Sequence, residues 1–98
     1  FWLAGNGLAE FLAGRYEEAL PWLRKARHVN PRFLPAMPHL ITCLVHDKQL
    51  HEAKAVAQDL LAVEPGFRVS TLSSWYPLRP PSNLDRYLSG LREAGLPE

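Results

Sequence analysis

Three side chains that could bind a metal ion share one face of an expected helix. His39, Cys43 and His46 fall within about 60° of one another when successive residues are placed about 100° apart, and His51 follows shortly afterwards. Imidazole nitrogen and thiolate sulfur are ligands that Zn²⁺ prefers. The apolar residues of this stretch centre on a different face, so a solvated helix face explains the spacing without a metal. Because no acidic residue stands ready to orient such ligands, we favour the solvated face and expect neither a metal nor another cofactor.

A local cluster of basic residues could contact phosphate or an acidic partner. Acidic residues flank it, and the chain carries eleven Lys and Arg against ten Asp and Glu, a formal net charge of +1. No aromatic residues alternate with the bases, as a single-strand binder would require. We therefore favour a solvated outer helix face and expect no direct contact with nucleic acid or with a membrane. The cluster consists of Arg24, Lys25, Arg27, His28 and Arg32.

The sequence offers little that could perform catalysis. It contains no glycine-rich phosphate loop, nucleophile elbow or paired-histidine zinc motif. Ser73 and Ser74 have no supporting spacing to a histidine, and a lone cysteine such as Cys43 is typical of a small packing residue. One cysteine excludes an internal disulfide and suits a reducing compartment, and the apolar stretches are too short to span a bilayer. We expect a cytoplasmic segment that is not itself an enzyme.

The elements that must position these residues form a repeat. Shifted by 34 residues, the stretch 16–33 aligns with 50–67 without a gap, and five of the eighteen pairs are identical. Chance would give roughly one identical pair, so the period indicates tandem structural units. The identical pairs are Glu18/Glu52, Ala19/Ala53, Val29/Val63, Pro31/Pro65 and Phe33/Phe67.

The second helix of each unit has the clearest pattern. Apolar residues recur with helical periodicity over 16–29, and 50–63 repeats this pattern. Pro31 and Pro65 follow these helices and end them, because the residue before a proline is pushed out of the α region. Pro21 falls in the second turn, where it removes a hydrogen bond. The sequence therefore predicts a kink or a late helix start there.

A further apolar helix is expected before each of these. One covers 2–13 and is closed by Gly14, and the other covers 35–46. After residue 67 the pattern degrades to a short helix over 69–76. Leu84, in a last expected helix, lies 34 residues after Leu50. This spacing makes the last helix the second helix of a shortened third unit. Its signals are Ser82 as N-cap and the stripe of Leu84, Tyr87, Leu88 and Leu91.

A 34-residue helix–turn–helix unit that ends in proline resembles the tetratricopeptide repeat. The resemblance covers about residues 3–67, and Lys48 occupies the place of the turn glycine. It implies an all-α fold, a right-handed superhelical array of tandem helix–turn–helix units with about two and a half repeats. The implied repeats are 1–33, 34–67 and a degenerate third repeat with a capping helix over 68–98. The resemblance is carried by Gly14-Arg15-Tyr16-Glu17-Glu18-Ala19-Leu20 with Asn30-Pro31, and more loosely by Leu50-His51-Glu52-Ala53 with Glu64-Pro65.

Arrays of this kind bind peptides on a concave face lined by the first helix of each unit. The resemblance therefore implies an apolar groove for a peptide or a partner helix. The alternative is that these residues pack against an upstream repeat or the chain's own third repeat, and we favour it because such arrays bury their faces on neighbours. The groove candidates are Ala4, Leu8, Phe11 and Leu12 from the first unit, and Pro38, Thr42, Val45 and His46 from the second.

The tail is similar to the C-termini of bacterial multidomain proteins. Those proteins join a class III adenylate or guanylate cyclase domain, or a winged-helix domain, to C-terminal tetratricopeptide repeats. Residues 64–70, 76–79 and 90–98 carry the likeness, which implies that Glu98 lies at or near the natural C-terminus. The chain also starts inside an apolar stretch, so we expect a piece of a longer protein.

Three hypotheses for function follow. The first is a protein–protein interaction module that serves as the C-terminal regulatory or scaffolding arm of a bacterial signalling protein, with a nucleotide cyclase as its effector. The second is the same arm on a winged-helix transcription regulator. The third is a structural self-association module. The partner is expected to be a protein or peptide, and Phe1, Trp2 and Phe11 could pair two copies into a homodimer through the N-terminal face.

Overall fold

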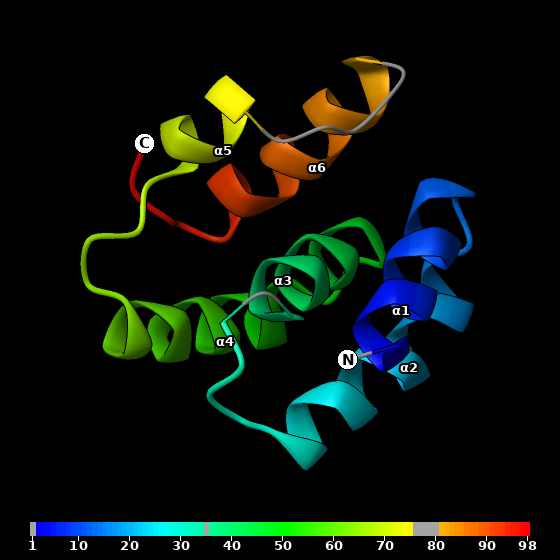
Figure 1. The fold of residues 1–98 in the computed structure, drawn as a ribbon. Coiled ribbons are helices and arrows are strands. Elements are labelled where there is room, and N and C mark those ends of the chain that lie inside the picture. Colours follow the sequence, from blue (N-terminus) through cyan, green and yellow to red (C-terminus); the bar gives the residue numbers. More distant parts are fainter. Residues whose placement is uncertain (1, 35, 76–80) are drawn as a thin grey trace.

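The protein is all-α, as the sequence predicts. The computed structural model describes the backbone of residues 2–34, 36–75 and 81–98 and the side chains of 5–34, 36–72 and 82–98. Within these ranges every regular element is a helix (Figure 1). The helices are α1 (Trp2–Leu12), α2 (Tyr16–Val29), α3 (Ala36–His46), α4 (Leu50–Val63), α5 (Val69–Trp75) and α6 (Pro81–Glu93).

The turns of the two helical hairpins, α1–α2 and α3–α4, each contain one residue in the left-handed backbone conformation. Gly14 has φ 81° and Lys48 has φ 63°. In the first turn, the N–H groups of Gly14 and Arg15 bond to carbonyls three and five residues back, on Phe11 and Glu10, at 2.9 Å each. Lys48 and the residue after it repeat this pattern. Such turns satisfy the last carbonyls of the preceding helix, which explains why both hairpins stop at equivalent places.

The second helix of each hairpin begins and ends where the sequence predicts. Glu17 and Glu18 lie in the first turn of α2, where carboxylates favour the positive end of the helix dipole. Pro21 lies inside α2, and the helix begins at Tyr16, which excludes the late start, one of the two alternatives that the sequence predicts for Pro21. The carbonyl at residue 17 loses one intrahelical donor there, but the exposed position of Pro21 leaves that carbonyl within reach of water.

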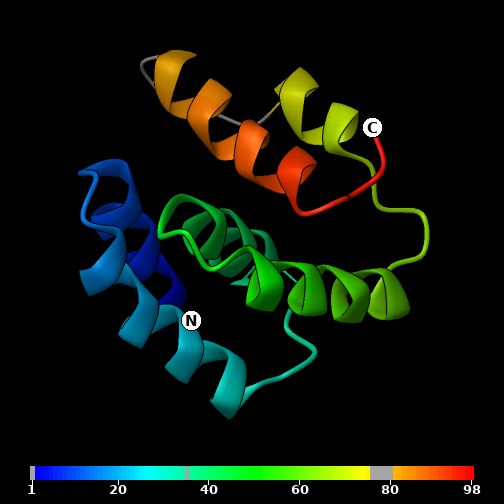
Figure 2. The same ribbon diagram turned by 180° about the vertical axis from the view of Figure 1, so that it is seen from behind.

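Helix α3 is the centre of the molecule. It packs on α2, α4 and α6, and it also touches α1 (Figures 1 and 2). Every residue from Ala36 to Val45 is buried except His39, which is half-buried. Pro38 sits in the first turn of α3, where a missing N–H costs nothing. Because neighbouring helices surround α3 on several sides, this helix cannot keep a polar face in water. The constraint applies to its two histidines, His39 and His46.

The third pair departs from the regular hairpins. Helix α5 spans only seven residues, and it packs on α6 (Figure 2). Helix α6 begins at Pro81, so the predicted N-cap at Ser82 is wrong, because proline fits the first position of a helix. The tail then turns at Gly95, with φ 92°, and runs back beside the start of α5.

Helix α6 lies on α3, on the face that the first helices of the two hairpins share (Figures 1 and 2). Tyr87, Leu88 and Leu91 from the predicted stripe are buried there. The apolar side of α6 therefore faces the first two units, and its other side carries the exposed Ser89 and Arg92.

None of the helices that the structure describes combines the length and the apolar character that a membrane crossing needs.

Candidate functional site

Three of the predicted groove residues, Phe11, Thr42 and His46, contact α6 on one surface. We call this surface the α1–α3 face and define it by these three residues, while Val45 is buried on α3. Phe11 is 1% exposed and Thr42 is fully buried. Leu8 and Leu12 are half-buried against the same core, Pro38 is buried on α3, and the side chain of Ala4 lies outside the described residues.

Arg86 of α6 joins this helix to the end of α1. Its guanidinium donates hydrogen bonds to the backbone carbonyls of Phe11 at 3.1 Å and Leu12 at 3.0 Å, and to the hydroxyl of Tyr16 at 2.7 Å. The last carbonyls of a helix lack intrahelical donors and carry the negative end of its dipole, so a cation is favoured there. The guanidinium carbon also lies 4.7 Å from the centroid of the Phe11 ring, within the range of a cation–π contact.

Two side chains of α3 hold the backbone of α6. Nε2 of His46 donates to the carbonyl of Arg86 at 2.7 Å, and the hydroxyl of Thr42 donates to the carbonyl of Tyr87 at 2.8 Å. A third bond of 2.6 Å joins Nδ1 of His39 to the hydroxyl of Tyr87. These bonds fix the position of α6 along α3 as well as its rotation, which apolar contact alone would leave free.

The two helices approach each other closely at Gly90. A Cβ atom placed on Gly90 would lie 2.1 Å from Oγ1 and 2.9 Å from Cα of Thr42, distances at which atoms overlap. Only glycine allows this approach. The short separation is what brings the Tyr87 carbonyl within bonding distance of the Thr42 hydroxyl.

Aromatic rings surround this contact. Phe11 stands edge-on to Tyr87 with ring centroids 5.7 Å apart, and Tyr16 stacks on His46 at 5.3 Å. Aromatic pairs at these separations add to the free energy of burial. The sequence placed Phe11 in an exposed N-terminal patch, and this is wrong for Phe11, because rings from α2, α3 and α6 enclose it. The side chains of Phe1 and Trp2 lie outside the described residues.

The solvated face predicted for His39, Cys43 and His46 is also wrong. Cys43 is fully buried, and its thiol donates to the carbonyl of Tyr16 at 3.4 Å, while both histidines bond to α6. Burial lowers the pKa of His39 to about 4. It also raises the pKa of the Cys43 thiol to about 12, an effect to which nearby Asp47 adds. Within the described ranges, no three potential ligands are placed to hold a metal ion together.

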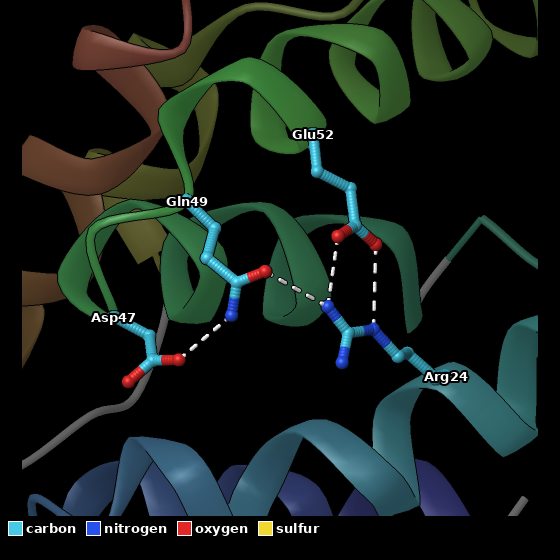
Figure 3. A network of polar contacts seen from close by, with 4 residues as sticks. All are labelled: Arg24, Asp47, Gln49 and Glu52. Atoms are coloured by element: carbon cyan, nitrogen blue, oxygen red, sulfur yellow. Dashed lines mark hydrogen bonds and ion pairs between the residues drawn. The ribbon is translucent and has the colours of Figure 1, made fainter.

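Two residues of the basic cluster, Arg24 and Arg27 of α2, form ion pairs between the hairpins. Arg24 bonds to the carboxylate of Glu52 at 2.8 and 3.3 Å and to Oε1 of Gln49 at 3.1 Å (Figure 3). Figure 3 also shows Gln49 donating to Asp47, at 2.8 Å. Arg27 pairs with Asp59 of α4. These contacts join α2 to α4 across two successive hairpins.

Sequence reasoning missed Arg86 and Gly90. Arg86 lies beside Tyr87 on a helix whose other inward residues are apolar, and its partners lie 70 to 75 residues earlier in the chain. One signal was available for Gly90, since a glycine inside an amphipathic helix often marks a close backbone approach.

The chain matches a known protein family. A family model described as tetratricopeptide repeat matches residues 10–76, well over half of the chain. The match includes α2, α3, α4 and α5 and the last turn of α1. Among curated proteins, no match to this chain is found.

Proposed function

This chain belongs to the tetratricopeptide repeat family, and from that premise we propose that it is the regulatory or scaffolding arm of a larger bacterial signalling protein, with a nucleotide cyclase as effector. Tetratricopeptide repeats are protein–protein interaction modules that present extended binding surfaces. In the proposed role, this segment sits at the C-terminal end of a cytoplasmic protein and catalyses no reaction itself.

One observation carries the proposal of an arm. The α1–α3 face, where a repeat of this family would receive a peptide, is filled by α6 through three hydrogen bonds from Arg86. A module whose α1–α3 face is already occupied by its own helix is preformed. Such a module suits the positioning of a neighbouring domain better than the binding of a free peptide.

Rigidity between the hairpins supports the same role. The ion pairs of Arg24 with Glu52 and of Arg27 with Asp59 connect α2 to α4. Exposed pairs of this kind contribute little to stability, but together they restrict the angle between successive hairpins. An arm that transmits the position of one domain to another requires such a restriction.

Three side chains that could have supported catalysis are engaged in structural contacts, and the side chains of Ser73 and Ser74 lie outside the described residues. His39 and His46 bond to α6, and the thiol of Cys43 bonds to α2. A nucleophilic cysteine needs a lowered pKa and access to solvent, whereas burial raises the pKa of Cys43 to about 12. This supports a non-catalytic segment.

The proposal that a cyclase is the effector rests on the sequence of the tail alone. Residues 64–70 and 90–98 are similar to the ends of cyclase proteins with C-terminal repeats, and the stretch 76–79 lies outside the described residues. The test is to sequence the coding region upstream of residue 1 and to measure cyclic-nucleotide synthesis by that protein with and without residues 1–98. A cyclase domain whose output changes on deletion would support the proposal.

Two other outcomes would exclude a nucleotide cyclase as the effector. A winged-helix domain upstream, with promoter occupancy that changes on deletion, would establish the transcription arm instead. A change in the mass of the protein and in nothing else would establish a self-association module. Arg86→Ala should reproduce part of the deletion effect, whereas Lys54→Ala on the exposed side of α4 should not.

A further inference from the structure

A groove runs between the end of α2 and α4, and α3 closes it on the inner side. It consists of two adjoining hollows of about 380 and 210 Å³, which share Arg27 and Pro31. The buried Met37 and Leu40 of α3 line these hollows from within. We call this the α2–α4 groove and define it by Arg24, Arg27, His28, Pro31, Glu52 and Asp59.

Three basic side chains of α2 reach the groove because of their helical spacing. Arg27 and His28 lie three and four residues after Arg24, so the three side chains share one face of the helix. Pro31 continues the same spacing beyond the end of α2. The second hairpin faces these residues and supplies two carboxylates from α4. The outer face that periodicity gives to these bases therefore borders a groove between the hairpins.

The two carboxylates hold the arginine side chains in place. Glu52 accepts bonds of 2.8 and 3.3 Å from Arg24, as Figure 3 shows, and Asp59 accepts a bond from Nη2 of Arg27. Nη1 of Arg27 is shielded from water and has no hydrogen-bond partner among the described residues. Such a donor costs free energy that an acceptor from a ligand would recover. Because Arg27 lines both hollows, a carboxylate that enters the groove meets this guanidinium.

The rim of the groove carries further positive charge. Lys25, His28 and Arg32 are exposed, and none of them forms a hydrogen bond or an ion pair with another residue that the structure describes. The dipole of α2 favours bases in its last turn, but Arg32 lies beyond the end of that helix. Arg24 and Arg27 are balanced by their carboxylates, so Lys25 and Arg32 give the groove a surplus of positive charge.

We propose that the α2–α4 groove binds an acidic segment of a partner protein, whose carboxylates meet Arg27, His28 and Arg32. Clusters of arginine recognise acidic motifs, and complementary charge favours such a partner. The groove is elongated, and it combines basic groups with the apolar Pro31 and Leu40. This combination suits an extended chain of organic side chains better than a small inorganic ion.

The inference rests on one part of the proposed function, the binding of proteins, and not on the identity of the effector. Its test uses the full chain alone and needs no cyclic-nucleotide synthesis. Fluorescein-labelled hexaglutamate is titrated with the protein, and its anisotropy is measured. We expect hexaglutamate to bind and hexaglutamine not to bind. The affinity for hexaglutamate should fall as the salt concentration rises to about 0.15 M, because salt screens exposed charges.

Two substitutions locate the binding site. Arg27→Gln should weaken hexaglutamate binding at least about tenfold, the effect of one lost hydrogen bond between charged groups. The matched control is Arg92→Gln on the exposed side of α6, which also removes one arginine from one ion pair with a carboxylate. This control should leave the affinity within about twofold of the wild type. The helix content of each variant is checked first by circular dichroism.

Arg32→Gln keeps the test decisive if Arg27→Gln fails to fold. Arg32 makes no contact of its own with another charged group that the structure describes, so its loss should not disturb the fold. It should weaken binding about threefold, as expected for one exposed charge.

Three outcomes would overturn the proposal. The first is a flat titration up to millimolar protein. The second is equal weakening by Arg92→Gln and by the groove variants, since net charge alone would then explain the binding. The third is displacement of hexaglutamate by an equal concentration of inorganic phosphate, which would assign the groove to a free anion.

Discussion

Lys48 adopts the left-handed backbone conformation that Gly14 adopts 34 residues earlier in the chain, with φ 63° against 81°. The two residues close equivalent turns, and each N–H bonds to the carbonyl three residues back. Glycine takes this conformation at no steric cost, whereas a residue with a Cβ is strained there by about 1–2 kcal/mol. The second hairpin therefore stores strain that the first hairpin avoids.

Lys48→Gly should stabilise the protein by about 1 kcal/mol, because it removes this strain while adding some flexibility to the unfolded chain. Urea unfolding followed by circular dichroism would measure the change. The matched control is Lys54→Gly within α4, which should destabilise by about 1 kcal/mol. A Lys48→Gly protein that unfolds at lower urea than wild type would contradict the argument.

Arg86→Ala should lower the free energy of unfolding by about 2 kcal/mol, since it leaves the last carbonyls of α1 without their charged donor. Arg86→Lys should recover only part of this loss, because an ammonium cannot bond to both carbonyls and the Tyr16 hydroxyl in the same fixed geometry. Chemical denaturation of the three proteins would measure the effect. Arg92→Ala, which removes an exposed ion pair with Glu98, should change little.

Acid should destabilise the protein through His39. Burial lowers the pKa of His39 to about 4 from an ordinary 6.5. Between these two pH values, His39 is protonated in the unfolded chain and neutral in the folded chain. The stabilisation is complete above about pH 6.5 and is lost progressively as the pH falls to about 4, with a total of roughly 3 kcal/mol.

His39→Gln separates this effect from the titration of carboxylates. It should flatten the fall in stability between about pH 6.5 and 4, whereas His28→Gln at an exposed position should leave it unchanged. The measurement is the urea midpoint across this range. An equal slope in wild type and His39→Gln would show that His39 is not the group responsible.

Cys43 should react slowly with alkylating reagents in the folded protein. Burial raises the pKa of its thiol to about 12, and only the thiolate attacks such reagents. At about pH 8, labelling should be at least ~100-fold slower than in urea-unfolded protein. Mass spectrometry of timed samples would follow it. Complete labelling of the native protein within seconds would mean that the hairpins open far more often than their packing implies.

Much of the local structure was predictable from the sequence. The helices at Tyr16–Val29 and Leu50–Val63 begin and end where periodicity and the following prolines place them. The signals that define them lie within one or two turns of the residues concerned, so no knowledge of distant contacts is required. Ser82 failed as an N-cap because Pro81, its immediate neighbour, is the better first residue of a helix.

The candidate site was predictable only in part. The groove residues Phe11, Thr42 and His46 do meet on one surface, since helical phase is a local property. The sequence favoured cover of these residues by a neighbouring repeat but left open whether an upstream repeat or the chain's own third repeat supplies it, and the structure has α6 of the third pair bonded to Thr42 and His46. His39 and His46 stand outside the apolar stripe of α3, and periodicity alone therefore assigned them to solvent.

By itself, the sequence determined the helices, the 34-residue repeat and the turns that close each hairpin, because these depend on residues close together in the chain. Only the tertiary structure decided that α6 lies on the α1–α3 face, with Arg86 at the end of α1 and Gly90 against Thr42. The physical reason is that the contacts between α6 and this face join residues 40 to 75 positions apart. Its energy comes from shape and hydrogen bonding between surfaces that exist only after the helices have formed.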